Sequence, residues 1–200
     1  KAETIASPNA YFNMENTGRV LQRKLFKQYE VSGGLHKRIF NYTKSKGIIL
    51  FSTPSHPTDV DLLEKFDCPI YKIGSDDAVN LPFLEYVAKT KKPIIYSTGM
   101  SYLKEIKKSI NEILKINKKL IALHCVSNYP TYPKDCNIKA VTVMQKALGL
   151  PIGWSDHIYD PDFSLYICLA AVVLGACVLE KHFNSIPDNP SPDVGHCLNK

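Results

Sequence analysis

The sequence predicts an α/β fold in which parallel strands alternate with helices, either an open doubly wound sheet or a (β/α)8 barrel. Three observations lead to this prediction. Six short apolar runs recur along the chain, segments with helical periodicity separate them, and each run ends in small polar or functional side chains. Runs that are apolar throughout are typical of strands buried on both faces, as in parallel sheets.

The N-terminal part of the chain shows a different pattern. Residues 1–18 are polar and predict an irregular segment. A first helix is predicted through Leu21, Leu25 and Tyr29, and a second from 35 to 46, because their apolar residues recur at helical spacing.

The regular alternation begins at residue 47. From their β-branched and aromatic content, strands are predicted at 47–54, 69–75, 93–100, 120–127, 151–157 and 177–183. From apolar residues three and four apart, helices are predicted at 58–66, 81–90, 102–118, 138–148 and 163–174. A barrel needs eight units, so this count fits a barrel whose first two βα units are absent. The lack of a G-x-G-x-x-G or Walker sequence after any strand argues against a nucleotide-binding sheet.

Composition narrows the functional classes. The chain has 200 residues and a formal net charge of +6, with lysines dispersed and no arginine-rich tract, so we expect no nucleic-acid partner. None of the six cysteines forms a C-x-x-C pair and most lie inside apolar runs, which indicates reduced core thiols and a cytoplasmic location. The uncharged run 163–179 is short for a membrane span, and Gly175 interrupts it, so we expect no membrane association.

Side chains that bind anions or metals recur where the predicted strands end. They are Lys72, Ser75, Ser97, Ser127, Tyr129, Ser155, His157, Glu180 and His182. Two histidines at neighbouring strand tips suit a divalent transition metal, while hydroxyls and a lysine suit phosphate or carboxylate groups. The alternatives are a helix N-cap for each hydroxyl and a hydrogen-bonded structural role for each histidine. Lys72 lies within an apolar strand and needs an anionic partner, which favours a functional role.

Seven motifs, in order, resemble those of the sialic acid synthase family. They are FSTP, YKIGS, KPIIYSTGM, HCVSNYP, GWSDH, LGACVLEKHF and PDVGHCLN, and the resemblance runs from about residue 40 to residue 200. The family comprises N-acetylneuraminate, legionaminate and pseudaminate synthases and spore-coat polysaccharide relatives. It implies a (β/α)8 TIM barrel, a C-terminal antifreeze-like domain and a domain-swapped homodimer. Residues 1–200 would then be a partial barrel with about six of the eight βα units, lacking the first two strands and the C-terminal domain and inactive alone.

The resemblance also assigns roles to individual residues. The substrate-binding residues it implies are Lys72, Ser75, Ser97, Ser127, Tyr129, Ser155 and Asp193. The catalytic residues it implies are Lys72, Tyr129 and Glu180. His157 and His182 would ligate a divalent metal, usually Mn, with Mg or Co as alternatives. Asp156 and Glu180 are expected to orient their neighbours and not to ligate the metal.

The implied reaction condenses phosphoenolpyruvate with the open aldehyde form of an N-acetylated amino-hexose, giving a nonulosonic (sialic-type) acid and phosphate. In this mechanism a metal held by His157 and His182 would polarise the aldehyde, C3 of phosphoenolpyruvate would attack it, and water would capture the positive charge at C2. The tetrahedral intermediate would then collapse with C–O cleavage and release phosphate. Two alternatives stay open. One is a class I aldolase in which Lys72 forms a Schiff base, and the other is an inactive barrel that binds a sugar phosphate.

Overall fold

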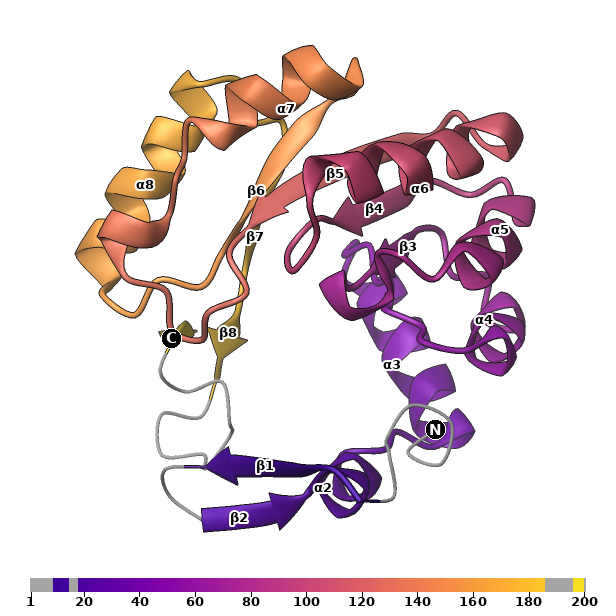
Figure 1. Cartoon of the computed structure of the whole chain (residues 1–200). Helices are drawn as coiled ribbons and strands as arrows, with labels where there is room; N and C mark the ends of the chain where they lie inside the picture. The colour runs from indigo at the N-terminus through magenta and orange to yellow at the C-terminus, as the bar shows by residue number, and fades with distance from the viewer. Residues whose placement is uncertain (1–8, 15–17, 186–195, 200) are drawn as a thin grey trace. The chain divides into compact units, whose positions relative to one another are not determined.

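The computed structural model describes residues 9–14, 18–185 and 196–199. The chain divides into two compact units, Lys1–Tyr71 and Lys72–Lys200 (Figure 1). The elements of the first unit are β1 (Tyr11–Met14), β2 (Gly18–Leu21), α2 (Gln22–Gln28), α3 (Gly33–Ser45) and α4 (Pro57–Glu64).

The first unit departs from the prediction near its beginning. The stretch predicted as irregular contains β1, which pairs with β2 in an antiparallel two-stranded sheet. Leu21 pairs with Tyr11 in this sheet, so the first predicted helix begins one residue later and is only seven residues long. The second predicted helix is confirmed as α3, whose first turn is capped by the Ser32 side chain.

The predicted strand 47–54 is wrong. Its only pairing is a single bridge between Ser52 and Tyr71, and the rest of the run is irregular. Ile48 and Ile49 are 60% and 68% exposed, so the apolar run does not occupy the buried position that its composition predicts. Without a continuous neighbouring strand, its β propensity alone does not produce a ladder.

The second unit is a parallel sheet with helices between its strands. The sheet runs in the order β3 (Tyr71–Ile73), β4 (Ile94–Ser97), β5 (Leu120–Cys125), β6 (Ile152–Asp156) and β7 (Leu179–Lys181). The pairs from β4 to β7 are parallel. The connecting helices are α5 (Leu81–Lys89), α6 (Leu103–Ile116), α7 (Ala140–Leu148) and α8 (Pro161–Val173). The remaining elements are the short helices η1 (Ser75–Asp77) and η2 (Pro133–Asp135) and the two-residue strands β8 (Phe183–Asn184) and β9 (Leu198–Asn199).

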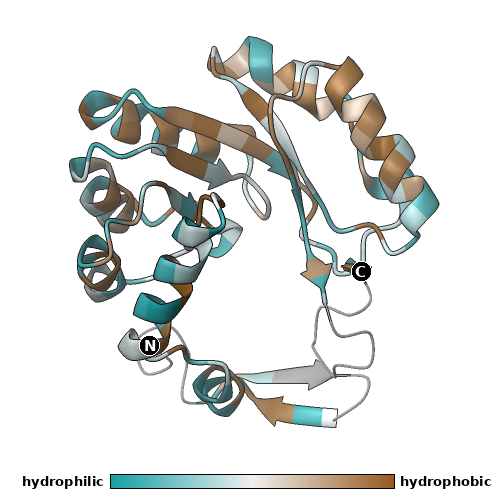
Figure 2. Cartoon of the chain, turned by 180° about the vertical axis from the view of Figure 1, so that it is seen from behind, coloured by the Kyte–Doolittle hydropathy of each residue, from teal (hydrophilic) through white to brown (hydrophobic). Residues whose placement is uncertain are grey.

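Burial explains why these segments adopt this arrangement. All residues of β3 and β6 are buried, and β4 and β5 are hydrophobic over most of their length in Figure 2. The helix α6 buries Ile106, Ile110 and Ile113 on one face, at the spacing that predicted it. Gly149 ends α7 in the left-handed conformation, with a φ of 64°. Figure 1 shows α5 to α8 on the outer side of a curved sheet, which confirms a partial (β/α)8 barrel.

The thiols are only partly as predicted. All six cysteines are free, and Cys68, Cys125 and Cys136 are buried. Cys177, however, is exposed. In the described part of the chain, no helix has the length and apolar character needed to cross a membrane.

The core of the second unit contains a histidine. His124 on β5 lies against Trp154, with 5.1 Å between the ring centroids, and its Nε2 donates a hydrogen bond to the Cys136 carbonyl at 2.9 Å. Burial lowers the pKa of His124, although hydrogen bonds to backbone carbonyls oppose this effect. The neutral ring is therefore the form that the fold stabilises.

We expect His124 to make the folded state sensitive to acid. Above a pH of about 6.5, the ring is neutral in both folded and unfolded states, and its contribution to stability is complete. Below that value the unfolded chain binds a proton that the folded chain resists, so stability falls by up to about 1.4 kcal/mol per pH unit. The melting temperature of the wild type should therefore drop more between pH 8 and pH 5.5 than that of His124→Gln, measured by circular dichroism. Equal drops would show that His124 does not contribute.

Candidate active site

The buried lysine predicted to bind substrate has the anionic partner that its burial requires. Lys72 is 7% exposed, and its Nζ lies 3.7 Å from Glu180 Oε2. The same nitrogen donates to Ser97 Oγ at 2.6 Å and to the Ile73 carbonyl at 3.0 Å. Lys72 and Glu180 come from β3 and β7, the two ends of the sheet order, so the sheet must curve to bring them together.

Glu180 connects the lysine to the next group of predicted residues. Its Oε1 accepts a hydrogen bond from Ser155 Oγ at 2.6 Å, while Oε2 faces Lys72. Ser155 Oγ is in turn 3.5 Å from His157 Nε2. Because the Ser155 proton is directed to Glu180, it does not occupy the lone pair on His157 Nε2. This arrangement gives Glu180 an orienting position between a cation and a hydroxyl.

The two predicted metal ligands belong to a cluster of aromatic rings. The ring centroids of His157 and His182 are 5.3 Å apart, and Tyr129 lies 4.2 Å from His157. His196 completes the cluster, 4.5 Å from His182 and 5.2 Å from Tyr129. The His157 Nδ1 donates to the Val126 carbonyl at 3.0 Å, which leaves Nε2 as the basic nitrogen.

The ionisation of His157 favours metal binding. Burial lowers the pKa of His157, while the hydrogen bond to Val126 opposes this effect. Its ring is therefore neutral at pH 7, the form in which imidazole is a ligand. Among the described residues, no set of three or more His, Cys, Asp or Glu side chains is arranged to hold a metal ion. Within the described ranges, the pair His157 and His182 is the candidate for holding a metal ion.

A second group of polar atoms gathers where β3, β4 and β5 end. The Gly99 N–H donates to Ser75 Oγ at 3.0 Å and to Cys125 Sγ at 3.1 Å. A Cβ atom on Gly99 would lie 2.3 Å from Ser127 Oγ and 2.7 Å from Ser75 Oγ. We call Ser75, Gly99, Cys125 and Ser127 the hydroxyl–thiol cradle. It brings together two of the predicted substrate-binding serines.

Two predicted residues have other outcomes. Asp156 is fully buried, and its Oδ2 accepts hydrogen bonds from Lys181 Nζ at 2.6 Å and from Ser164. Lys181 Nζ also donates to the Ile158 carbonyl at 2.9 Å, so Asp156 ties β7 and α8 to the end of β6. Asp193, predicted to bind the sugar, lies outside the described residues.

Sequence reasoning missed three members of these clusters. His196 follows Asp193 within the motif PDVGHCLN, where only the aspartate was assigned a role. Cys125 was interpreted as a core thiol because it ends an apolar run. Gly99 lies within the motif KPIIYSTGM without an assigned role, and its closeness to three side chains depends on the packing of separate strands.

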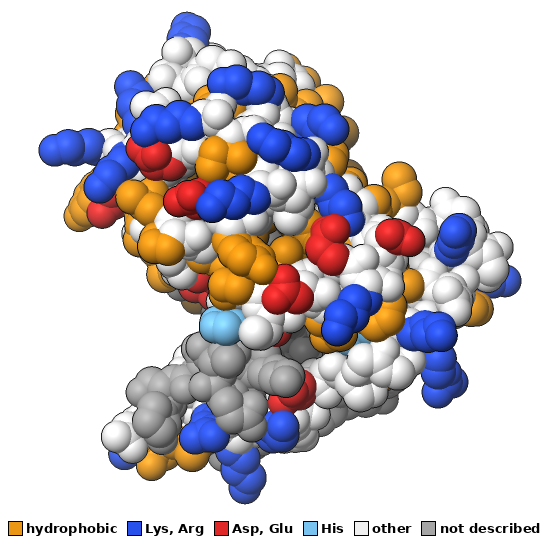
Figure 3. Space-filling view, turned by 90° about the vertical axis from the view of Figure 1, so that its right-hand side faces the viewer, with side chains coloured by type: hydrophobic (Ala, Val, Ile, Leu, Met, Phe, Trp, Pro, Cys, Tyr) orange, Lys and Arg blue, Asp and Glu red, His pale blue; other side chains and the backbone are white. Residues whose placement is uncertain are grey.

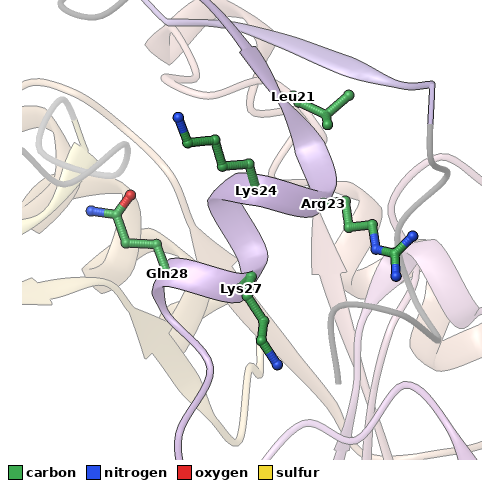
Figure 4. Close-up of a pocket in the computed structure, with 5 residues that line it drawn as sticks. All are labelled: Leu21, Arg23, Lys24, Lys27 and Gln28. Atoms are coloured by element: carbon green, nitrogen blue, oxygen red, sulfur yellow. The ribbon is translucent and has the colours of Figure 1, made fainter.

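Positive charge alone does not define a second site in the first unit. A pocket beside α2 is lined by Leu21, Arg23, Lys24, Lys27 and Gln28 (Figure 4). The cationic side chains in it point in different directions, and Lys27 pairs with Glu30 at 2.9 Å. In Figure 3, Lys and Arg side chains are likewise scattered among acidic and apolar ones on the face shown. This distribution does not form a concentrated anion-binding surface.

Parallel strands that present a lysine, serines and histidines at their carboxyl ends define a protein of the (β/α) barrel class with a polar site. The chain matches the model of the NeuB family over residues 1–200, and it belongs to that family. The resemblance to sialic acid synthases is thereby confirmed.

Named relatives agree with this assignment. The chain is 38% identical to the N,N'-diacetyllegionaminic acid synthase of Campylobacter jejuni, over 86% of this chain and 51% of the relative. It is 32% identical to the human N-acetylneuraminate-9-phosphate synthase, over 76% of this chain and 42% of the relative. The crystal structure of an N-acetylneuraminic acid synthetase from Leptospira borgpetersenii superposes with a TM-score of 0.84 and 29% identity, covering 89% of this chain and 61% of that one. The chain thus spans about half the length of the first of these relatives.

Proposed function

We propose that the protein condenses phosphoenolpyruvate with the open aldehyde form of an N-acetylated amino-hexose, giving a nonulosonic acid and phosphate. Membership of the NeuB family supports the reaction class. One observation supports placing this reaction in the second unit: a chain of contacts runs from Lys72 through Glu180 and Ser155 to His157. It places a cation, hydroxyls and a neutral imidazole beside one another in a single site.

Lys72 supplies the positive charge for the anionic substrate. Its ammonium group is held by Ser97 and by the carbonyl of Ile73, with Glu180 farther away at 3.7 Å. A phosphate or carboxylate oxygen can therefore take the place of the weaker Glu180 contact without disturbing the two hydrogen bonds. Charge-assisted hydrogen bonds from Lys72 and the neighbouring hydroxyls would then offset the substrate's negative charge throughout the reaction.

The histidine pair provides the place for a divalent ion, for which we propose Mn. His157 presents its Nε2 because Nδ1 is committed to the Val126 carbonyl, the arrangement in which a backbone oxygen fixes a metal-binding imidazole. His182 lies beside it. A divalent ion bound there would supply Lewis-acid polarisation of the sugar aldehyde. Tyr129 is 54% exposed and packs on His157, so it can contact a sugar at the mouth of the site.

The proposal predicts that activity depends on metal. Full-length protein treated with a chelator should lose turnover, and Mn²⁺ should restore it, because a chelator competes with the imidazole ligands for the ion. Turnover is measured as phosphate release from phosphoenolpyruvate with each of a panel of N-acetylated amino-hexoses, and the product is identified by mass spectrometry. A nonulosonic acid formed at full rate after chelation would contradict the metal proposal. A protein that releases no phosphate with any sugar would contradict the proposed reaction.

A further inference from the structure

Cys125 faces polar atoms, unlike a thiol that merely fills a core. It is the last residue of β5, and in the sheet it pairs in register with Ser155 of β6. Its Sγ accepts a hydrogen bond from the Gly99 N–H at 3.1 Å and lies 3.3 Å from Ser75 Oγ. By contrast, the buried Cys136 thiol donates to the carbonyl of Tyr132, within its own loop.

The contacts of Cys125 depend on a very close approach of the backbone. A Cβ on Gly99 would lie 3.0 Å from Cys125 Sγ, 2.7 Å from Ser75 Oγ and 2.3 Å from Ser127 Oγ. Real Cβ atoms are not found at the two shorter distances, so a residue with a side chain would displace the hydroxyls. The hydroxyl–thiol cradle is therefore held together by direct contact between the ends of three strands.

The Gly99 amide fixes part of the proton arrangement in the cradle, while the hydrogen bond between Ser75 Oγ and Cys125 Sγ can run in either direction. The Gly99 N–H is shared between Ser75 Oγ and Cys125 Sγ, so Ser75 Oγ acts as an acceptor and its single proton remains to be donated. Sulfur is a weak acceptor, whereas an oxyanion accepts a strong charge-assisted hydrogen bond. Even where Ser75 donates to Cys125 Sγ, its proton is therefore held only weakly and is available to an anionic ligand.

We propose that Cys125 is a positioning residue for the phosphoenolpyruvate side of the site. Its sulfur holds the Ser75 hydroxyl and the Gly99 amide while competing only weakly for the Ser75 proton. This inference rests on the proposed function and on the contact with phosphoenolpyruvate that the family resemblance implies for Ser75. It gives the thiol a role in anion recognition, transmitted through Ser75 and not through contact with the reacting atoms.

Steady-state kinetics test this role. Cys125→Ala should raise KM for phosphoenolpyruvate by about 10-fold, the effect of losing one hydrogen-bonded support, while KM for the sugar and kcat stay within about twofold. Cys125→Ser should also raise KM for phosphoenolpyruvate, because a hydroxyl oxygen accepts the Ser75 proton more strongly than sulfur does. Cys136→Ala removes a buried thiol outside the cradle and should leave both KM values unchanged. In a Ser75→Ala background, Cys125→Ala should have no further effect, since Cys125 acts through Ser75.

Thiol alkylation provides a measurement that does not need turnover. Phosphoenolpyruvate alone, or inorganic phosphate alone, should slow the reaction of Cys125 with iodoacetamide relative to the exposed Cys177, as followed by peptide mass spectrometry. Protection by phosphoenolpyruvate without protection by phosphate would assign the effect to the whole substrate. Normal wild-type turnover with an unchanged phosphoenolpyruvate KM in both Cys125 variants would overturn this inference alone. Wild-type protein with neither turnover nor protection would overturn the proposed function and this inference with it.

Discussion

His182→Ala should abolish condensation while leaving the fold intact, and His157→Ala should do the same to activity. The two rings lie 5.3 Å apart, and each variant would remove one of the two proposed ligands of the ion. Changes to groups that only orient a ligand already cost about 10–100-fold, so removal of a ligand should cost at least that much. His182 is the cleaner test because it is only partly buried, whereas His157 also holds the Val126 carbonyl.

The measurement combines Mn²⁺ binding, followed by electron paramagnetic resonance, with phosphate release under the same conditions. His36→Ala is the matched control, because it removes a histidine of α3 that, like His182, is only partly buried. It should bind Mn²⁺ and turn over like the wild type. Wild-type Mn²⁺ affinity in His182→Ala, with a normal circular dichroism spectrum, would show that the histidine pair does not hold the metal.

Strong local patterns made most of the second unit predictable. The predicted strand 151–157 is β6, and the predicted helix 102–118 is α6, each trimmed by one or two residues at its ends. Both have an unambiguous signal, since β6 is buried along its whole length and α6 carries one apolar face. The order of these segments then fixes a curved parallel sheet with its polar strand ends on one edge.

The run 47–54 shows where composition fails. Its apolar residues match those of a buried strand, but burial depends on what the rest of the chain places beside it. The N-terminal hairpin of β1 and β2 shows the opposite error, because strands formed where none was predicted. Its residues alternate little between apolar and polar, and its stability depends on the pairing of the two strands. A sequence pattern indicates which secondary structure a segment can form, and the segments packed beside it determine whether that structure forms.

The candidate site divides in the same way. Lys72 and His157 were predictable because a buried cation and a histidine at a strand end are chemically conspicuous. His196 and Cys125 were not, because their relevance depends on distances across separate segments, such as the 4.5 Å between the rings of His196 and His182. A thiol at the end of an apolar strand has the same sequence signature whether it packs in a core or supports a hydroxyl.

Lys72→Met should lower kcat/KM for phosphoenolpyruvate by roughly 30-fold to several thousand-fold. Truncating one partner of a buried charge interaction costs about 2–5 kcal/mol, and every 1.36 kcal/mol is tenfold. The loss of kcat/KM should be large because the same ammonium group also holds Ser97 and faces Glu180. Lys115→Met is the matched control: it removes a lysine paired with Glu112 on the surface of α6, where such a pair contributes little, and should leave kcat/KM unchanged.

Lys72→Arg separates the two chemistries open to this lysine. If Lys72 acts by its charge, as we propose, arginine should retain part of the phosphoenolpyruvate binding, though imperfectly, because a planar guanidinium replaces a compact ammonium within 2.6 Å of Ser97. If Lys72 forms a Schiff base, arginine should be as inactive as methionine, because a guanidinium does not form the imine that an amine forms. Treatment with borohydride in the presence of substrate, followed by peptide mass spectrometry, gives an independent answer. A stable adduct on Lys72 would establish the aldolase mechanism, whereas an unmodified Lys72 with partial activity in Lys72→Arg is the result expected of a charge that binds the substrate.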